Sequence, residues 1–287
     1  ADLAKANAAM VNDIAKFNEE FLCVPEYKVR DFMTTSGTMG QPVSFFLTEN
    51  DLKRLGVNES NSFKLCGLSK DDKVLLTTTI DKCFMAGLAY YLGVQALGIG
   101  IIRTGPGNLK YQWDMIERFR PNILIAVPSF LLKMIKFARE NNIDFSNISL
   151  KKAICIGEPI RNSELELNTL GKAISKELDI KLHSTYASTE MMTAFTECSA
   201  GKGGHLQEDL LFVEILDENG IEVGNEEIGE VVITSLGVEG MPLLRYKTGD
   251  ICKVYRLKCS CGRSSLRLGP VLGRKGQRLK IKGTTIF

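Results

Sequence analysis

Hydroxyl groups and glycines are concentrated in one short segment near the start of the chain, Thr34-Thr35-Ser36-Gly37-Thr38-Met39-Gly40-Gln41-Pro42. Small residues let backbone N–H groups approach an anion, and hydroxyls add short charge-assisted hydrogen bonds, so this composition suits a phosphate-binding turn. The segment does not match the Walker pattern, because its spacing is short and no Gly-Lys-Ser/Thr sequence follows. Taken alone, it is better explained as an exposed loop.

Three later segments carry chemistry that complements this loop. Tyr186-Ala187-Ser188-Thr189-Glu190 follows a predicted strand, and its ring, hydroxyl and carboxylate would serve a base, a phosphate and a metal ion. Tyr246-Lys247-Thr248-Gly249-Asp250 places a carboxylate at a turn, where it can accept hydrogen bonds from both hydroxyls of a ribose, and Gly273-Arg274 completes the set. Each segment also has a purely structural interpretation: a core tyrosine, a type II turn and a solvated basic strand. Their order and spacing together favour a nucleotide site.

A second kind of chemistry is predicted by the cysteines and histidines. Cys198 and His205 are close in sequence, and Cys259-Ser260-Cys261-Gly262 is a tight thiolate pair followed by a turn. Three thiolates and one imidazole make a closed tetrahedral zinc set. The alternative is that these are unligated thiols of a reducing compartment. His183 lies in a predicted strand, and we interpret it as a packed histidine rather than a catalytic base.

Strands and helices alternate between these segments from Thr48 to Thr185. Apolar spacing and capping residues predict helices that start at Thr48 and run toward Cys66, at 85–97, at 108–120, from Pro128 onward, and from a cap at Ser163. Short β-branched or apolar runs predict strands at 73–79, 99–103, 122–127, 153–156 and 180–184. Such repeats of about 30 residues favour a mainly parallel sheet covered by helices on both faces.

The pattern changes after residue 205. Short alternating runs at 210–216, 229–236, 250–257 and 265–272 are separated by turn residues, with no helix of convincing length. They predict an antiparallel sheet or partial barrel appended to the α/β part. We therefore expect an α/β fold in which residues 1–205 form the α/β part and residues 206–272 form an antiparallel β part packed on it.

Composition limits the classes of function. The chain has 287 residues with 36 Lys and Arg against 34 Asp and Glu, a net charge of +2 that provides no overall field for nucleic acid or a membrane surface. The 44% hydrophobic and 24% charged residues exclude long disorder, collagen and coiled coil. Eight cysteines, most of them single in apolar stretches, indicate buried thiols in a reducing cytoplasm. The apolar run 84–102 contains several glycines, so it favours a buried helix and strand over a membrane span.

One strongly basic run raises the question of nucleic-acid binding. Seven positive charges without an intervening acid occur late in the chain, at Arg263, Arg267, Arg274, Lys275, Arg278, Lys280 and Lys282. Nucleic-acid binding is one interpretation, and a solvated strand face near a phosphate or coenzyme A is the other. Because no aromatic residues are interleaved for base stacking, we expect no nucleic-acid partner.

The ordered set TTSGTMGQP, YASTE, YKTGD and GRKGQRLKIKG resembles the AMP-forming adenylating enzymes. Gly157-Glu158-Pro159, and Met241-Pro242-Leu243-Leu244-Arg245-Tyr246 ahead of Thr248-Gly249-Asp250, are similar to the phenylacetate–CoA ligase branch. The resemblance covers roughly residues 20–287 and is specific as a set rather than motif by motif. It implies the large N-terminal domain of such an enzyme, with 273–287 as a hinge segment toward a small C-terminal domain that this sequence does not contain.

The resemblance also implies a role for individual residues. The β- and γ-phosphates of ATP would be held by Thr35, Ser36, Gly37, Thr38 and Gly40. The adenine would be walled by Gly157, Glu158 and Pro159, with Tyr186 against its face. Thr189 would contact the α-phosphate, Glu190 would ligate Mg²⁺, and Asp250 would bind the ribose with Arg274 assisting. The acyl pocket would begin at Phe84, Met85, Gly87 and Ala187. The cysteine–histidine pair and the CxCG sequence match a structural zinc site that is common in this branch, formed here by Cys198, His205, Cys259 and Cys261.

Two positions depart from the family pattern. Ala187 replaces the usual glycine of the central motif, which would narrow the adjacent acyl pocket, and Gly276 stands where an acidic hinge residue is common. The small C-terminal domain of the family also carries a lysine that reaches the α-phosphate, and nothing in this sequence matches it. We expect a truncated or partly disordered form of a longer protein rather than a natural end at Phe287.

The leading hypothesis is an ATP-dependent acid–thiol ligase that forms an acyl-adenylate from a carboxylic acid, with an aryl or arylacetic acid as the expected substrate by analogy. The acyl group would pass to coenzyme A, with release of AMP and pyrophosphate. One alternative is an adenylating enzyme that delivers the acyl group to a protein or an amine. Another is a catalytically silent, zinc-stabilised nucleotide-binding module. A homodimer would suit the branch.

Overall fold

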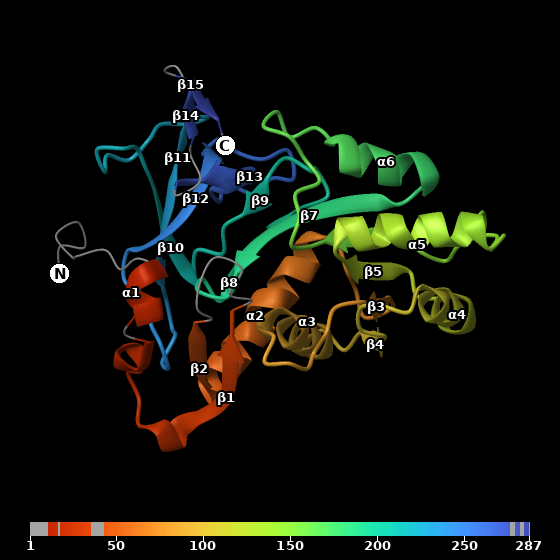
Figure 1. The fold of residues 1–287 in the computed structure, drawn as a ribbon, viewed down its shortest axis with the longest axis horizontal. Coiled ribbons are helices and arrows are strands. Elements are labelled where there is room, and N and C mark those ends of the chain that lie inside the picture. The colour runs from red at the N-terminus through yellow and green to blue at the C-terminus, as the bar shows by residue number, and fades with distance from the viewer. Residues whose placement is uncertain (1–10, 17, 36–42, 276–278, 282–283, 287) are drawn as a thin grey trace.

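A computed structural model describes residues 11–16, 18–35, 43–275, 279–281 and 284–286 of the chain (Figure 1). Its central feature is an 11-stranded sheet in the order β10-β11-β12-β13-β9-β8-β7-β6-β5-β3-β4. The parallel and antiparallel parts meet at β7 (Lys181–Ser188), which pairs in parallel with one neighbour and antiparallel with the other. The parallel and antiparallel parts predicted from the sequence therefore belong to one sheet, joined at β7.

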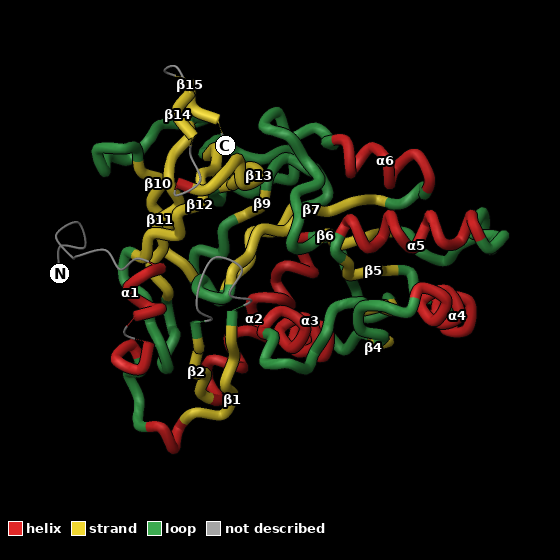
Figure 2. The backbone as a smooth tube through the Cα atoms, in the orientation of Figure 1, coloured by secondary structure: helices red, strands yellow, loops and turns green. Residues whose placement is uncertain are grey.

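The parallel part of the sheet is short-stranded and covered on both faces. Its strands besides β7 are β3 (Lys73–Leu76), β4 (Gly100–Arg103), β5 (Ile123–Ala126) and β6 (Lys152–Cys155). Its helices are α2 (Glu49–Leu65), α3 (Met85–Ala96), α4 (Leu109–Phe119), α5 (Pro128–Glu140) and α6 (Thr169–Glu177). Alternate residues of β5 face opposite layers: Ile123 and Ile125 pack with α2 and α3, whereas Leu124 packs with α4, α5 and α6. The expected doubly covered parallel sheet is confirmed (Figure 2).

Capping chemistry fixes where most of these helices begin. The Thr48 side chain accepts a hydrogen bond from the backbone of Asp51, whose carboxylate accepts one from the backbone of Thr48, so the predicted capping box opens α2. The predicted cap at Ser163 is wrong. Asn168 caps α6 instead, because Leu165 adopts a left-handed backbone conformation (φ 64°) and residues 161–167 form a turn ahead of the helix.

The antiparallel part continues the sheet beyond β7. Its strands are β8 (Thr193–Glu197), β9 (Gly204–His205), β10 (Leu211–Leu216), β11 (Ile228–Ser235), β12 (Tyr246–Tyr255) and β13 (Arg267–Arg274). Figure 1 shows β10, β11 and β12 on the side of the molecule opposite to α4, α5 and α6. The four late runs read from the sequence correspond to β10, β11, β12 and β13, whereas β8 and β9 are additional strands that bridge them to β7.

The N-terminal region packs a small hairpin beside this sheet. It comprises α1 (Val11–Lys16), the 3₁₀ turns η2 (Asn18–Phe21) and η3 (Glu26–Lys28), and the paired strands β1 (Val29–Thr34) and β2 (Ser44–Thr48). The pair β14 (Leu279–Ile281) and β15 (Thr284–Ile286) follows β13. A core cluster connects the hairpin, α2 and α3 to the antiparallel strands, through Phe45, Leu55 and Phe195 among others. Within the described ranges, no helix is long and apolar enough to cross a membrane, and residues 84–102 divide into α3 and β4 as predicted.

Candidate functional site

A cavity of about 420 Å³ opens where the parallel strands end. Val127 and Ile156, which directly follow β5 and β6, form one wall together with residues 184–188 of β7, at the edge where open α/β sheets usually bind ligands. Helices α2 and α3 form a second wall, and Asp250 of β12 and Arg274 of β13 form a third. Segments that lie far apart in the sequence thus enclose one space.

Most of the predicted site residues that the structure describes line this cavity. They are Phe84, Met85, Gly157, Glu158, Pro159, Tyr186, Ala187, Thr189, Asp250 and Arg274. Thr35, Gly87 and Glu190 are not among the lining residues. Ser36, Gly37, Thr38 and Gly40 fall outside the described residues, as does Gly276. The nucleotide-binding and acyl-binding predictions therefore converge on a shared cavity, apart from Gly87, Glu190 and the hydroxyl- and glycine-rich segment.

Three of the predicted residues sit next to the cavity or serve the packing around it. The Oγ1 atom of Thr35 accepts a hydrogen bond from the backbone of Val43 at 3.0 Å, which joins the ends of β1 and β2. A Cβ atom at Gly87 would lie 1.7 Å from the carbonyl oxygen of Thr79, so this glycine lets α3 pack against the segment after β3. Glu190 follows the end of β7, and its charge contributes to the raised pKa of Tyr246, behind the larger effect of burial.

Asp250 is the centre of a hydrogen-bonded group on the antiparallel side. Its carboxylate is buried, with Oδ2 accepting from the hydroxyl of Tyr186 and Oδ1 accepting from Nε of Arg274, both at 2.9 Å. Phe195 stacks on the ring of Tyr186 at 5.8 Å between centroids. Burial raises the pKa of Tyr186 well above its usual value, so the phenol remains a hydrogen-bond donor. The two partners hold the Asp250 carboxylate in a fixed position, where its oxygens can accept hydrogen bonds from hydroxyl groups of a ligand.

Glu158 is held by the first turn of a helix. Its two carboxylate oxygens accept hydrogen bonds from the backbone N–H and the hydroxyl of Ser129, each at 2.9 Å, at the N-terminus of α5. Favourable interaction with the helix dipole keeps this carboxylate in place. Gly157 adopts φ 74°, a left-handed conformation that a glycine reaches without strain. The segment after β6 is therefore a rigid wall of the cavity, formed by backbone and a pinned side chain.

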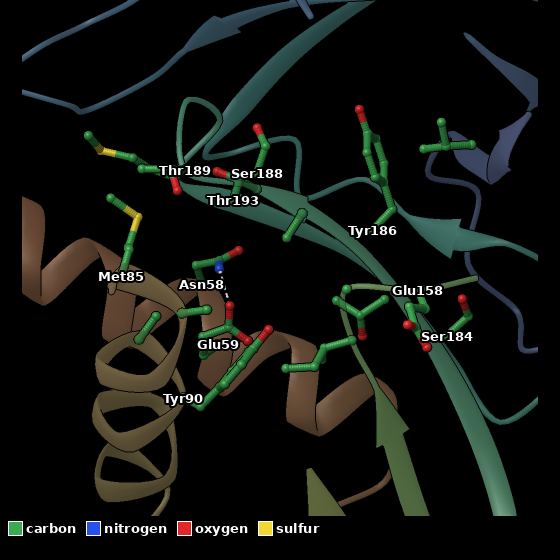
Figure 3. A pocket seen from close by; sticks show the side chains of 18 of the residues that line it. Asn58, Glu59, Met85, Tyr90, Glu158, Ser184, Tyr186, Ser188, Thr189 and Thr193 are labelled. Carbon is green, nitrogen blue, oxygen red and sulfur yellow. Dashed lines mark hydrogen bonds between the residues drawn. The ribbon is translucent and has the colours of Figure 1, made fainter. Parts of the chain in front are cut away.

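The opposite wall contains polar residues that the sequence analysis missed. Asn58 and Glu59 from α2 and Tyr90 from α3 line the cavity (Figure 3). Burial raises the pKa of Glu59 to about 8, against a smaller opposing effect of its hydrogen bond with Asn58. A signal for Glu59 was present in the sequence, since it lies four residues after Leu55 and four before Phe63, on the buried face of the predicted helix.

The predicted metal ligands form a compact cluster away from the cavity. The ligand atoms of Cys198, His205, Cys259 and Cys261 all lie within 4.8 Å of one another. The Sγ atoms of Cys198 and Cys259 are 3.8 Å apart, and Sγ of Cys261 is 3.6 Å from Nε2 of His205. Tetrahedral zinc with standard bond lengths requires S–S edges of about 3.8 Å and S–N edges of about 3.6 Å. The donor set and its geometry fit a zinc ion.

Backbone structure around the cluster explains how it forms. Cys198 follows β8, His205 belongs to β9, and the other two cysteines lie in a turn after β12 in which Cys259 and Arg263 are hydrogen-bonded. The Nδ1 atom of His205 lies 2.8 Å from the hydroxyl of Ser265, which leaves Nε2 directed at the thiols. Such an outer partner fixes the ring orientation of metal-binding histidines.

The remaining predicted features have structural partners. In the basic run, Arg267 is buried and donates to the carbonyls of Lys202 and Leu257, while Lys275 pairs with Glu230 at 2.7 Å. With Arg274 engaged by Asp250, these charges serve the folded chain itself. His183 is packed as predicted, with Nδ1 3.2 Å from the carbonyl oxygen of Glu197, and burial lowers its pKa to about 4.

Solved structures share this fold. An open conformation of 2-hydroxyisobutyryl-CoA ligase, in complex with 2-HIB-AMP and CoA, superposes with a TM-score of 0.87 at 20% identity, covering 99% of this chain and 67% of that one. O-succinylbenzoate coenzyme A synthetase from Bacillus subtilis, in complex with ATP and magnesium ion, gives a TM-score of 0.64 at 19% identity, covering 89% of this chain and 52% of that one. These similarities show the α/β fold.

Sequence relatives are more informative about the family. A phenylacetate-coenzyme A ligase from Thermus thermophilus is 29% identical over 268 residues, covering 92% of this chain and 59% of that protein. One from Aromatoleum evansii is 30% identical over 295 residues, covering 100% of this chain and 64% of that protein. The chain thus spans less than two thirds of the length of these relatives. The AMP-binding enzyme family matches residues 25–240, so the expected resemblance is confirmed and the chain belongs to that family.

Proposed function

We propose that this chain forms the adenylating part of an ATP-dependent acid–thiol ligase, which activates a carboxylic acid and transfers it to coenzyme A. The observation that carries the proposal is the single cavity lined by Glu158, Tyr186, Thr189 and Asp250, which come from segments far apart in the sequence. Membership of the AMP-binding enzyme family supports it. So do relatives named as phenylacetate-coenzyme A ligases, and an aryl or arylacetic acid is the proposed substrate class.

The nucleotide would occupy the side of the cavity between β7 and β12. The Asp250 carboxylate, positioned by Tyr186 and Arg274, is suited to accept hydrogen bonds from the two ribose hydroxyls. The adenine would lie between the Tyr186 ring and the wall formed by residues 157–159. We propose the segment 35–40 as the contact for the β- and γ-phosphates, with Thr35 at its described end.

The chemical step joins two anions, so it depends on charge neutralisation and alignment rather than on covalent participation of the protein. An oxygen of the substrate carboxylate attacks the α-phosphorus, and the bond to the bridging oxygen of pyrophosphate breaks. The thiol of coenzyme A, as thiolate, then attacks the acyl carbon and expels AMP. Thr189 lines the cavity beside the proposed α-phosphate position.

Glu190 is the proposed magnesium ligand. A carboxylate together with phosphate oxygens suits Mg²⁺, which usually keeps several waters and takes few protein ligands. Glu190 directly follows Thr189, which lines the cavity just beyond the end of β7. When bound, the ion would neutralise phosphate charge.

We also propose a structural zinc ion at the cluster formed by Cys198, His205, Cys259 and Cys261. The four donors fill a tetrahedral set, so the site leaves no position for a substrate. The ion would fasten the segment after β8 to the turn after β12. Thiolate ligands also fit the proposed cytoplasmic location, where cysteines stay reduced.

The acyl acceptor and the assembly state complete the proposal. Coenzyme A is the proposed acceptor, while the similarity to an indoleacetate–lysine synthetase, 24% identical over 225 residues, makes an amine the alternative to test. A homodimer is proposed from the resemblance alone, and light scattering coupled to gel filtration checks it.

Acid-dependent exchange of labelled pyrophosphate into ATP tests the central step. We expect exchange with at least one aryl or arylacetic acid, measured on the natural polypeptide that contains this chain. Adding coenzyme A should then yield a thioester, and adding amines should not yield an amide. Glu190→Gln should reduce exchange on the order of a hundredfold, because a charge-stabilising group of the transition state is removed. Absence of exchange across a broad panel of acids would rule out the proposed function.

A further inference from the structure

A buried carboxylic acid with an unused oxygen stands at the α2–α3 wall of the cavity. Glu59 is 4% exposed, and its Oε1 atom accepts a hydrogen bond from Nδ2 of Asn58 at 2.9 Å. The other oxygen, Oε2, has no hydrogen-bond partner within the described part of the chain, although the residue lines the cavity. Buried polar groups are nearly always hydrogen-bonded, so this oxygen is available to a ligand.

Asn58 cannot turn to serve the second oxygen. Its own Oδ1 accepts hydrogen bonds from the backbone N–H of Ala194 at 3.0 Å and from Nε2 of Gln207 at 2.7 Å. These contacts fix the orientation of the amide, with its NH₂ group directed at Oε1 of Glu59. The position of the Glu59 carboxyl is therefore set by the surrounding protein.

Tyr90 provides a second polar group beside it. The side chain is buried, it lines the cavity, and Figure 3 shows it next to Glu59. Its hydroxyl makes no hydrogen bond with the described residues. The neighbouring lining residues Leu55, Met85 and Ala89 are apolar. Apart from Asn58, whose amide is already engaged, the two polar groups are thus surrounded by apolar residues of α2 and α3.

The charge environment favours a neutral partner. Burial raises the pKa of Glu59 to about 8, so the group is largely protonated at neutral pH. Among the described residues no lysine or arginine pairs with it, and the titratable groups that face it are Tyr90 and the buried thiol of Cys66. A protonated carboxyl can both donate and accept a hydrogen bond, as a hydroxyl group can.

We propose that Glu59 and Tyr90 select a hydroxyl substituent on the acid that is activated, at the end away from its carboxylate. This inference rests on the proposed function. The carboxylate must meet the α-phosphate beside Thr189 at the end of β7, whereas Glu59 and Tyr90 belong to α2 and α3. Figure 3 shows Thr189 and Tyr90 on opposite sides of the cavity. The substrate class is therefore a hydroxylated aryl or arylacetic acid rather than a wholly apolar one.

The experiment compares 4-hydroxyphenylacetate and 3-hydroxyphenylacetate with phenylacetate by kcat/KM in acid-dependent pyrophosphate exchange. A site that hydrogen-bonds a substrate hydroxyl discriminates strongly against the analogue without it, so we expect a preference of about tenfold or more for a hydroxylated acid. Glu59→Leu should bring the two kinds of acid to within about twofold, because its effect falls on the hydroxylated acid. Tyr90→Phe should reduce the preference in part, and Glu59→Gln should keep most of it, because an amide also donates and accepts.

Glu49→Gln is the matched control, since Glu49 lies on the same helix with its side chain 67% exposed and paired with Lys53. If exchange occurs but phenylacetate is preferred, or if Glu59→Leu leaves the ratio unchanged, the inference is wrong while the proposed function stands. If Glu59→Leu does not fold, Tyr90→Phe decides by the same ratio. Preference for an acid with an ammonium group over the hydroxylated acids would also overturn it. No exchange with any acid would remove the proposed function and the inference together.

Discussion

The hydroxyl of Tyr186 donates a 2.9 Å hydrogen bond to Oδ2 of Asp250, which links β7, the strand shared by the parallel and antiparallel parts, to β12. The link spans 64 positions in the sequence and joins two segments that were singled out separately for nucleotide chemistry. It orients the carboxylate while leaving lone pairs on both oxygens for a ligand. The strength of nucleotide binding should therefore depend on this pair.

The first prediction is that Asp250→Asn weakens the binding of ATP by about tenfold to a hundredfold, because hydrogen bonds to a charged group contribute roughly 1.5–3 kcal/mol. Tyr186→Phe keeps the ring and loses only the link to the carboxylate, so its effect should be smaller. Isothermal titration calorimetry with ATP measures both. Asp114→Asn, in an exposed pair with Lys110 on α4, is the control. Equal affinities for the Asp250 variant and the control would contradict the ribose role.

The parts of this site that could be predicted from the sequence are those in which the interacting residues are close together along the chain. Helix α2 and its capping box were readable because Thr48 and Asp51 are three residues apart. The double role of β7 was not, since no local pattern shows that one strand pairs in parallel with β6 and antiparallel with β8. Gly87 illustrates the same limit: its role is set by the carbonyl of Thr79 on another segment.

The second prediction concerns metal content. Protein purified without chelators should carry about one zinc ion per chain by elemental analysis, because the four donors close a tetrahedral site. Metal binding to a folded site adds its free energy to folding. Removal of the ion should therefore lower the melting temperature on the order of 10 °C, given a few degrees for each kcal/mol at this chain length.

Cys259→Ser should lose zinc and melt at a lower temperature, as the chelated wild type does. Cys83→Ser replaces an exposed thiol outside the cluster, so it should keep both properties. A metal-free preparation that melts at the same temperature as the untreated protein would exclude the structural zinc.

The third prediction follows from the burial of His183, which lowers its pKa from the usual 6.5 to about 4. Between these pH values the unfolded chain binds a proton that the folded chain does not, so stability is lost as the pH falls from about 6.5 to 4. Since one pKa unit corresponds to about 1.36 kcal/mol, the difference between 6.5 and about 4 limits the loss from this group to about 3–4 kcal/mol. His183→Gln should remove that part of the acid sensitivity.

Urea unfolding at several pH values measures the effect as the difference between wild type and His183→Gln. The comparison of the two proteins is needed because thiolate metal sites also lose their ion in acid, which would lower the free energy of unfolding of both proteins alike. Parallel curves for the two proteins between pH 6.5 and 4 would show that His183 is not the group responsible.

The last prediction concerns Glu59, whose titration should change stability with pH in the direction opposite to that of His183. Burial raises the pKa of Glu59 from 4.5 to about 8, so in this window the unfolded chain releases a proton that the folded chain retains. The contribution of Glu59 to the free energy of unfolding should therefore fall as the pH rises from about 4.5 to 8, by several kcal/mol if the whole shift is realised. Glu59→Gln carries no titrating proton and should flatten the curve over that range, whereas Glu49→Gln should not, because Glu49 lies at the exposed start of the same helix. A bound acid whose hydroxyl contacts Glu59 should raise stability in the wild type more than in Glu59→Leu at equal concentration of the acid, because the wild type binds it more tightly. Curves for the wild type and Glu59→Gln that run parallel from pH 5 to 8 in urea unfolding would mean that the carboxyl is ionised in the folded state, which would also remove the reason for a neutral hydroxyl as its partner.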